Sequence, residues 1–384
     1  MTPQVLVIGA GPAGISCAYH LQKANIPYVV VDKANIIAST WASLYPSLKL
    51  NTSRFFSHMP ERRFPLSYGI FPSGKQYHAY LVKYVCDFGL NIRLGVTIKD
   101  VCKEGDGWRV MSSEGSAWYP CVICASGRFN APIMPYIDGM ESFTGRIIHA
   151  HNYLGHAPFI GKRVMVVGNG PSGVDIASEL GRKRGCEAVY LSQRAGVILR
   201  PRYPYGLPKH AWTILAEKLP TRFGSRLIKH IESLKFGNLD KIGIRTPPTG
   251  GESSAAGGTR GHELITAVKR GWVTCVPAPL RFESDSVILA DNKRVAVDVV
   301  IMGTGYNAVL HDYLKLDAPR DKADWLLREG QDPKNIPTGK RQVAGQTGLY
   351  EVGTFYQGKG TMYNINVEAK QAVDEILGRL GKQG

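Results

Sequence analysis

Two short runs of apolar residues, Val5–Ile8 and Val164–Val167, organise the hydrophobic pattern of the chain. Four consecutive apolar residues are typical of a parallel strand that is buried on both faces. A glycine-rich turn follows each run, and a stretch of small residues with helical character follows each turn. The pattern therefore predicts two α/β units, in each of which a buried strand leads through a tight turn into a helix.

Both turns have the G-x-G-x-x-G spacing of dinucleotide-binding units. Such a turn needs glycine where the backbone bends, where it approaches a pyrophosphate and where the helix packs on the strand. One motif is weak support for a nucleotide site, but two motifs that each stand between a strand and a helix are stronger. The residues predicted to hold the two pyrophosphates are Gly9, Gly11, Pro12, Ala13, Gly14, Gly168, Gly170, Pro171, Ser172 and Gly173.

The residues that end the next strand of each unit distinguish the two nucleotides. In the first unit this strand ends at Asp32, followed by Lys33, and a carboxylate here can accept hydrogen bonds from a ribose diol. In the second unit the strand is followed by Ser192 and Arg194, and a guanidinium can bind a 2′-phosphate in bidentate fashion. We therefore predict an FAD site followed by an NADPH site, with an ordinary surface arginine as the alternative for Arg194.

Two later apolar segments end on small residues, as is typical where the backbone passes close to a cofactor. The first, over residues 121–127, contains Ala125 and Gly127. The second, over residues 298–305, ends in Gly303, Thr304 and Gly305. We expect these segments to be the crossings between the two domains and to contribute to cofactor binding.

Charge is distributed unevenly along the 384 residues, whose length suggests two or three domains. The formal net charge is +16, and the stretch from Arg194 to Arg270, with 14 Lys and Arg against 5 Asp and Glu, contributes +9 of it. No nucleic-acid-binding motif accompanies this charge, so no nucleic acid partner is expected. Two predicted helices there, 211–219 and 225–236, mix apolar and basic residues. This mixture favours a solvated helical face, with contact to an anionic membrane surface as the alternative.

Seven scattered cysteines fit a reduced compartment better than a disulfide framework. Cys121 and Cys124 have C-x-x-C spacing, but they lie in an apolar run that predicts a strand. Residues three apart in a strand point to opposite faces, so buried structural thiols are expected rather than a redox dithiol. No histidine and cysteine spacing indicates a metal site. The first strand starts by residue 5 and no apolar run reaches about 18 residues, so we expect a cytoplasmic protein.

The segment Phe143–Tyr153 reads F-x-G-x-x-x-H-x-x-x-Y, the signature of the class B flavin monooxygenases. It lies between the two glycine turns, as it does in that family. The resemblance extends along nearly the whole chain, through Asn51, the turn at 303–306 and a C-terminal strand that ends at Gly353. In its length and in the sequence around Leu48 and Phe71, the chain most resembles the compact bacterial and YUCCA-like members.

The chain departs from the family pattern at several positions. Its Asn51-Thr-Ser stretch is similar to that of the amine- and sulfur-oxidising members and is absent from the YUCCA-type members. Ala38-Ser-Thr stands where the family has Gly-Gly before the tryptophan that corresponds to Trp41. Ser126 replaces a threonine, and Tyr153 differs from the Trp-Pro ending of the Baeyer-Villiger members.

The resemblance implies that NADPH reduces FAD, that reduced flavin and dioxygen form a C4a-(hydro)peroxide, and that bound NADP⁺ shields it. It implies cofactor-binding roles for Trp41 and Gly353. The amide of Asn51 is our candidate for orienting the peroxide or the nicotinamide, with capping of the local turn as the alternative. His149 is the second catalytic candidate, and coupling of the two domains is favoured over proton donation for it.

We therefore predict an α/β fold with two Rossmann-like dinucleotide-binding domains, the second inserted in the first. Residues 1–155 and 305–384 would form the FAD domain. Residues 156–304 would form the NADPH domain, with a basic helical insertion at about 199–262. The expected activity is oxygenation of a small organic metabolite at nitrogen or sulfur with NADPH, FAD and O2. The alternatives are YUCCA-like oxidative decarboxylation of an arylpyruvate or other keto acid, and an NADPH-dependent disulfide reductase.

Overall fold

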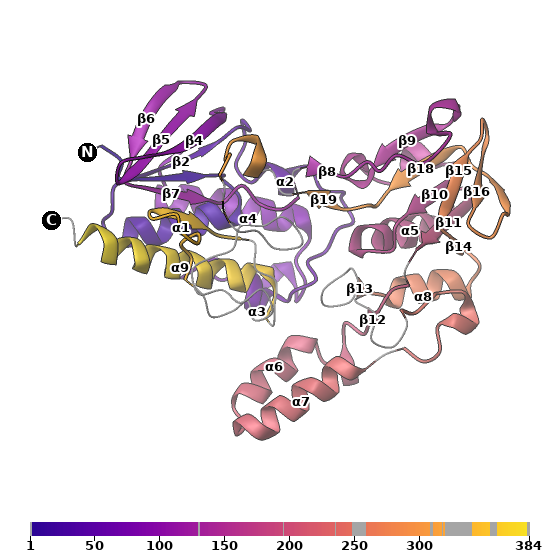
Figure 1. Ribbon diagram of the computed structural model, residues 1–384. Helices are drawn as coiled ribbons and strands as arrows, with labels where there is room; N and C mark the ends of the chain where they lie inside the picture. The colour runs from indigo at the N-terminus through magenta and orange to yellow at the C-terminus, as the bar shows by residue number, and fades with distance from the viewer. Residues whose placement is uncertain are drawn as a thin grey trace. The chain divides into compact units, whose positions relative to one another are not determined.

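The structure, a computed structural model, describes residues 2–129, 131–194, 196–234, 236–247, 259–307, 310–316, 318, 340–353 and 359–381 (Figure 1). The chain forms two units. Unit 1 consists of residues 1–43, 52–131 and 306–384, and unit 2 consists of residues 44–51 and 132–305. Each unit is built around one five-stranded sheet.

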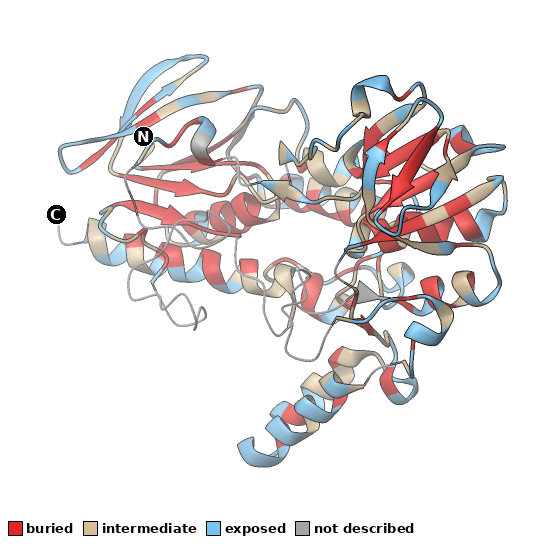
Figure 2. Cartoon of the chain, turned by 45° about the vertical axis from the view of Figure 1, so that its right-hand side comes forward, coloured by how far each residue is buried: buried red, intermediate tan, exposed pale blue. Residues whose placement is uncertain are grey.

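The sheet of unit 1 has the strand order β20-β7-β1-β2-β3, and every pairing in it is parallel. Its strands are β1 (Val5–Ile8), β2 (Tyr28–Asp32), β3 (Ile92–Leu94), β7 (Cys121–Cys124) and β20 (Leu349–Glu351). Residues of β1 and β7 are buried along their whole length, as expected for central strands with both faces covered (Figure 2). The helices of this unit are α1 (Pro12–Lys23), α2 (Ser39–Ala42), α3 (Arg54–Ser57), α4 (Gly74–Phe88) and α9 (Thr361–Leu380).

A second, antiparallel sheet of unit 1 consists of β4 (Ile98–Glu104), β5 (Gly107–Ser112) and β6 (Gly115–Tyr119). Strand β5 is the middle strand and pairs with both neighbours. Trp108 of β5 is fully buried and joins Leu6 of β1 in one hydrophobic core. The sequence around Trp108 and Trp118 predicts two strands that form a hairpin, and the pairing of β5 with β6 confirms it.

The sheet of unit 2 has the strand order β14-β11-β10-β18-β9, again parallel throughout. Its strands are β9 (Arg146–His149), β10 (Arg163–Val167), β11 (Ala188–Gln193), β14 (Thr274–Pro277) and β18 (Val299–Met302). Helices α5 (Pro171–Lys183) and α8 (His262–Lys269) pack against each other and contribute to the core of this sheet. A three-stranded antiparallel sheet covers part of the unit, with strands β15 (Pro279–Phe282), β16 (Ser286–Leu289) and β17 (Arg294–Ala296).

The basic insertion of unit 2 contains a helical hairpin, α6 (Lys209–Glu217) and α7 (Thr221–Ser233). The two helices predicted over 211–219 and 225–236 are therefore present, with their starts two and four residues earlier. Short strand pairs are β12 (Leu199–Arg200) with β13 (Thr259–Arg260), and β8 (Ala131–Pro132) with β19 (Tyr306–Asn307).

The structure corrects the predicted domain boundary at residue 155. Strand β9 pairs with β18 in the sheet of unit 2, from Arg146 opposite Val299 to His149 opposite Met302. Residues 132–155 therefore belong to unit 2. Residues 44–51 were also expected in the first domain, and they belong to unit 2 because their side chains pack on α5. The second boundary, expected at 304/305, lies at 305/306.

Candidate active site

The first glycine turn connects β1 to α1 through backbone that requires glycine at two points. Gly9 has φ of +111°, and a Cβ atom there would lie 2.5 Å from the carbonyl oxygen of Ala125. A Cβ atom on Gly14 would lie 1.8 Å from the carbonyl oxygen of Gly9. Gly11 is the N-cap of α1 and Pro12 its first residue, and no side chain of a described residue caps this terminus. Its backbone N–H groups and helix dipole therefore suit a pyrophosphate.

Asp32 ends β2 beside this turn, as predicted. One carboxylate oxygen accepts a hydrogen bond from the backbone N–H of Ala10 at 2.7 Å, and the other accepts one from Ala34 at 2.8 Å. These bonds fix the carboxylate next to the glycine turn, while each oxygen can still accept a further bond from a ribose hydroxyl. Lys33, which follows it, is exposed.

Gly353 also lies at the first turn of α1, since a Cβ atom on it would be 2.9 Å from Cβ of Ala13. Its N–H donates a hydrogen bond of 2.7 Å to Glu368 of α9, and Glu368 in turn pairs with Arg341 at 2.9 Å. Both side chains of that pair are buried. Gly127, at φ +77°, follows β7 two residues after the Ala125 carbonyl that the turn contacts. Among the predicted FAD residues, Gly9, Gly14, Asp32, Ala125 and Gly353 thus lie together around the N-terminus of α1.

Trp41 lies in the short helix α2, with its ring against Tyr77 of α4 at a centroid distance of 4.5 Å. Ala38, the residue before this helix, has φ of +52° and donates a backbone hydrogen bond of 3.0 Å to Ala10. A left-handed alanine costs about 1 kcal/mol that glycine would not. The absence of the family's Gly-Gly before the tryptophan is therefore accommodated by strain, and the segment still packs on the glycine turn.

The second glycine turn repeats the geometry of the first in unit 2. Gly168 has φ of +105°, and a Cβ atom on it would lie 2.5 Å from the carbonyl oxygen of Gly303. A Cβ atom on Gly173 would lie 1.9 Å from the carbonyl oxygen of Gly168. Helix α5 starts here, with Gly170 as N-cap and then Pro171 and Ser172, and no described side chain caps it. This terminus is therefore built for the same kind of anion.

Asn169, within this turn, was not singled out from the sequence. Its side-chain Nδ2 atom is buried and has no hydrogen-bond partner among the described residues. A buried donor without a partner costs roughly 1–3 kcal/mol. A phosphate oxygen at the turn would provide that partner, so the orphaned amide supports a nucleotide site here.

Ser192 and Arg194 have different environments at the end of β11. The hydroxyl of Ser192 is buried and donates to the carbonyl oxygen of Pro277 at 3.1 Å. This contact gives Ser192 a role in holding β14 against β11. Arg194 is exposed just beyond the strand. It stands where a guanidinium can reach a ribose phosphate, and its role as the 2′-phosphate ligand stays a prediction.

His149 ends β9 with both ring nitrogens bonded to backbone. Its Nδ1 accepts from the N–H of His151 at 3.0 Å, and its Nε2 lies 3.1 Å from the carbonyl oxygen of Gly305. The tautomer that satisfies both contacts is neutral, with the proton on Nε2, and burial lowers the pKa of this imidazole. Thr304 donates to the carbonyl oxygen of Ile133 at 2.5 Å. These bonds tie the segment over residues 298–305 to Ile133 and to the end of β9, which favours positioning over proton donation for His149.

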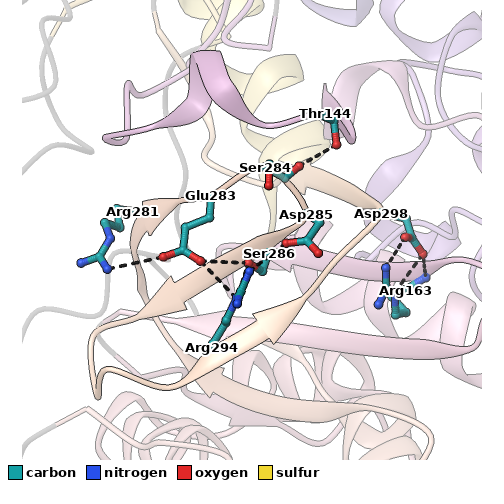
Figure 3. A network of polar contacts seen from close by, with 9 residues as sticks. All are labelled: Thr144, Arg163, Arg281, Glu283, Ser284, Asp285, Ser286, Arg294 and Asp298. Carbon is teal, nitrogen blue, oxygen red and sulfur yellow. Dashed lines mark hydrogen bonds and ion pairs between the residues drawn. The ribbon is translucent and has the colours of Figure 1, made fainter.

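The remaining signature residues make close packing contacts within unit 2. The ring of Phe143 packs edge-on against Phe282 at 5.3 Å, and Gly145 leaves no room for a side chain beside the carbonyl oxygen of Asp298. Figure 3 shows Thr144 bonded to Ser284 at 2.6 Å. In the same network Asp298 accepts three bonds from Arg163, from its backbone N–H, Nε and Nη2. These contacts lower the pKa of Asp298 to about 2.

An open cavity of about 460 Å³ lies beside this network. It is lined by residues at the amino ends of β9, β10 and β18, among them Arg146, Lys162 and Asp298. The glycine turn and Gly303 lie at the carboxyl ends of the same strands. The cavity therefore lies at the opposite edge of the sheet from the predicted nucleotide site. Ligands of parallel sheets bind at the carboxyl ends of the strands, so the cavity is not the nucleotide site.

Residues 44–51 form a strap that packs on α5. The hydroxyl of Tyr45, a buried residue, donates to Asp175 at 3.1 Å, and Ser47 donates to Glu179. Asp175 and Glu179 are four residues apart and so lie on one face of α5. The strap ends at the half-buried Asn51, the predicted catalytic amide. The helix that begins at the second glycine turn thus holds the segment that carries Asn51.

Tyr153, the last residue of the signature, packs against Tyr45 of the strap. It is fully buried, with its ring 5.8 Å from that of Tyr45 and stacked on Phe159 at 5.5 Å. Tyr45, Asp175 and Glu179 were not predicted from the sequence. Two acids spaced i, i+4 on the helix that follows the glycine turn were the available signal, because buried carboxylates need partners.

Burial raises the pKa of Asp175 from 3.8 to about 6, although Tyr45 and Arg202 oppose the shift. Between about pH 4 and pH 6 the folded protein binds a proton that the unfolded chain has released, so stability falls as pH rises through this window. Asp175→Asn removes the titration. We expect its free energy of unfolding, relative to that of the wild type, to be about 2 kcal/mol higher at pH 7.5 than at pH 4.5, so that the variant is relatively more stable at the higher pH. Urea unfolding at both pH values measures this difference.

Glu187→Gln, which neutralises an exposed carboxylate of the same unit, is the matched control and should show the same difference from wild type at both pH values. An equal effect of Asp175→Asn at pH 4.5 and pH 7.5 would contradict the buried, titrating carboxylate.

Cys121 and Cys124 lie in β7 as free thiols. Both are buried, and burial raises the pKa of Cys121 to about 11 and that of Cys124 to about 12. Cys124 belongs to the core on one face of the sheet, whereas Cys121 is near Arg379. The expectation of structural thiols is confirmed. Among the described residues, no group of three or more His, Cys, Asp and Glu could hold a metal ion, and no helix is long and apolar enough to cross a membrane.

Comparison with known proteins places these features in a family. The model of the family described as pyridine nucleotide-disulphide oxidoreductase matches residues 6–205. Indole-3-pyruvate monooxygenase YUCCA1 of Oryza sativa subsp. japonica is 29% identical over 368 residues, which cover 93% of this chain and 87% of the relative. The flavin-containing monooxygenase from Stenotrophomonas maltophilia has the same fold, with a TM-score of 0.71, 24% identity and 98% of both chains covered. The bacillithiol disulfide reductase Bdr from Staphylococcus aureus, at 13% identity, reaches a TM-score of 0.71 over 98% of both chains.

Two Rossmann-like units, each with a glycine turn at a helix N-terminus, define a flavoprotein oxidoreductase that uses two dinucleotides. The chain belongs to the pyridine nucleotide-disulphide oxidoreductase family and is a class B flavin monooxygenase-like protein. The family's description names a pyridine nucleotide, and FAD and NADPH are the cofactors predicted for the two turns. The predicted fold class is thereby confirmed.

Proposed function

We propose that this enzyme oxygenates a small organic metabolite at nitrogen or sulfur, with NADPH and O2 as co-substrates. The observation that supports this most is the signature of residues 143–153, whose Phe143, Gly145, His149 and Tyr153 each have a specific contact within unit 2. A signature whose every fixed position has a defined contact is stronger support than its letters alone. The Asn51-Thr-Ser stretch favours nitrogen or sulfur as the oxidised atom.

FAD would be held by the first glycine turn, Asp32 and Gly353, and NADPH by the second turn and Arg194. Bound FAD supplies the redox and oxygen chemistry, and the chain supplies positions and excludes water. The neutral His149 fixes the crossing at Gly305. The strap, which Tyr45 and Ser47 hold on α5, carries Asn51, and the amide of Asn51 would orient the nicotinamide or the oxygenating group.

Oxidative decarboxylation of an arylpyruvate is the second candidate. The curated relatives named as indole-3-pyruvate monooxygenases, 26–29% identical over most of the chain, favour it. A disulfide reductase is disfavoured, because burial in β7 raises the pKa of both C-x-x-C thiols well above the usual value for cysteine.

Anaerobic reduction by NADPH, followed by mixing with oxygenated buffer, tests the class. We expect a spectral species distinct from reduced and oxidised flavin that persists after mixing and decays faster with a suitable amine or sulfide. Immediate return to oxidised flavin, with stoichiometric hydrogen peroxide for every amine, sulfide and keto acid tried, would contradict a monooxygenase. Faster decay with arylpyruvates alone would support the second candidate.

Asn51→Ala should raise the fraction of NADPH consumption that ends as hydrogen peroxide, because the amide no longer orients the reacting group. Loss of one hydrogen bond of about 1.5 kcal/mol predicts a roughly 10-fold faster decay of the oxygenated species. The flavin content should change little, and the rate of anaerobic reduction should fall only if the amide orients the nicotinamide. Asn152→Ala, at an exposed position of the same unit, is the control. Unchanged coupling in Asn51→Ala would assign Asn51 to the local turn instead.

A further inference from the structure

The helical hairpin α6–α7 presents an unusual combination of side chains at its tip, residues 215–226. Three large apolar side chains of the tip are exposed, Leu215 by 45%, Leu219 by 38% and Phe223 by 58%. They follow one another at intervals of four residues across the turn between the helices. Apolar exposure confined to one contiguous patch marks an interaction surface more often than scattered exposure does.

The opposite side of the hairpin is well packed, so the exposure is not a sign of a loose element. A Cβ atom on Gly224 would lie 2.3 Å from the carbonyl oxygen of Ala216, which shows how closely α7 approaches α6. Trp212 donates from its indole N–H to the carbonyl oxygen of Pro204 at 2.9 Å. Lys209 and Glu232 form an ion pair of 3.0 Å between the two helices. The packed inner side makes the tip a defined surface.

Basic residues alternate with the apolar ones at the tip. Lys218, Arg222 and Arg226 are exposed, again at intervals of four residues, and each stands one residue before or three after an apolar member of the patch. No ion pair within 4.0 Å joins any of the three to a carboxylate of the described residues. From 199 to 236 the chain has eight Lys and Arg against two Glu. The patch is therefore apolar and strongly positive at once.

We propose that the α6–α7 tip docks on an anionic lipid bilayer, with Leu215, Leu219 and Phe223 inserted at the headgroup boundary and the cations on the lipid phosphates. Apolar side chains beside basic ones, on a helix that is too short and too polar to span, are the arrangement that interfacial helices use. A second copy of this chain fits less well, because a two-fold contact would bring these cations against one another. An acidic protein partner is distinguished below.

Cosedimentation of the FAD-loaded enzyme with vesicles tests the proposal. We expect binding to vesicles of phosphatidylcholine with 30% phosphatidylglycerol, loss of at least ~10-fold in affinity on pure phosphatidylcholine, and weakening by salt. The double variant Lys218→Glu/Arg222→Glu should lose at least ~30-fold on anionic vesicles. The double variant Leu219→Ser/Phe223→Ser should lose ~10-fold even at low salt. Flavin content and unfolding temperature check that each variant is folded.

Matched controls separate the patch from general surface properties. Leu66→Ser removes a side chain that is 88% exposed in unit 1, and Lys293→Glu reverses an exposed charge elsewhere in unit 2. Both should bind vesicles as the wild type does. Absence of binding to anionic vesicles would overturn the proposal, and so would tip variants that bind as well as the controls. The patch would instead be a contact between two copies if the protein does not bind vesicles and sediments as a dimer that only the tip substitutions dissociate. Binding that depends on the charges but not on Leu219 and Phe223 would also overturn insertion and point to an acidic partner.

Discussion

A methyl group added at Gly14 should give protein without flavin, whereas one added at Gly173 should give yellow protein that NADPH cannot reduce. In Gly14→Ala the new Cβ would lie 1.8 Å from a carbonyl oxygen, and in Gly173→Ala the distance would be 1.9 Å. Neither contact can be relieved by a side-chain rotation, since the atom met is backbone. Helix α1 or α5 must move away from its strand, which displaces the N–H groups that face the pyrophosphate. We expect each variant to lose at least ~100-fold in affinity for its own dinucleotide, equivalent to roughly 3 kcal/mol.

The two variants control each other, because the glycines lie in different units. Flavin content after purification and NADP⁺ binding by calorimetry should be affected separately, Gly14→Ala losing only the first and Gly173→Ala only the second. Gly378→Ala in α9 and Gly237→Ala in unit 2 add a methyl group where no atom of the described residues beyond the local backbone lies within 4 Å, and both should behave as wild type. Loss of both cofactors in either variant, with the unfolding temperature unchanged, would contradict the assignment of one nucleotide to each turn.

The parts of this protein that follow local rules could be predicted from its sequence. Short apolar runs predict the strands and the hairpin around Trp108. Glycine spacing predicts both turns, because these turns need residues with positive φ angles. Asp32 was identified because its position depends on a strand and a turn that are adjacent in the chain. Its hydrogen bond to Ala10 spans only 22 residues.

The parts that depend on long-range packing could not be predicted in this way. The strap at 44–51 joins unit 2 through bonds between residues about 130 apart, from Tyr45 to Asp175 and from Ser47 to Glu179. Strand β9 looked like a continuation of the first domain, and only its pairing with β18 shows that it completes the second sheet. A four-residue apolar run carries no information about which sheet it joins.

The same limit applies to the predicted functional residues. Ser192 was expected to bind cofactor because of its place in the chain. Its hydroxyl donates to a carbonyl within the sheet, and its cofactor role stays a prediction. For His149, coupling of the two domains was expected over proton donation. Its two backbone contacts both lie within unit 2, so they support a positioning role there and the coupling stays a prediction. Glu368, which holds Gly353, comes from a helix that the sequence marks only as amphipathic. Residues close in the chain to a glycine turn could thus be predicted for each nucleotide site, whereas the distant residues that hold them in place could not.

Arg194→Ala should convert the enzyme from one that prefers NADPH to one that scarcely distinguishes NADPH from NADH. The 2′-phosphate is the only difference between the two cofactors, and Arg194 is an exposed cation directly after β11, where the adenosine ribose of a Rossmann-like unit lies. A charge-assisted pair to phosphate of about 2 kcal/mol predicts a roughly 30-fold rise in the KM for NADPH. The KM for NADH should change by less than about 2-fold, and kcat should be unaffected for both, since the hydride-donating ring is remote from the ribose phosphate.

Arg182→Ala removes an exposed arginine from α5 and controls for the loss of positive charge in the same unit. Equal effects on NADPH and NADH, or an effect of Arg182→Ala as large as that of Arg194→Ala, would show that general electrostatic attraction and not a specific phosphate contact sets the preference.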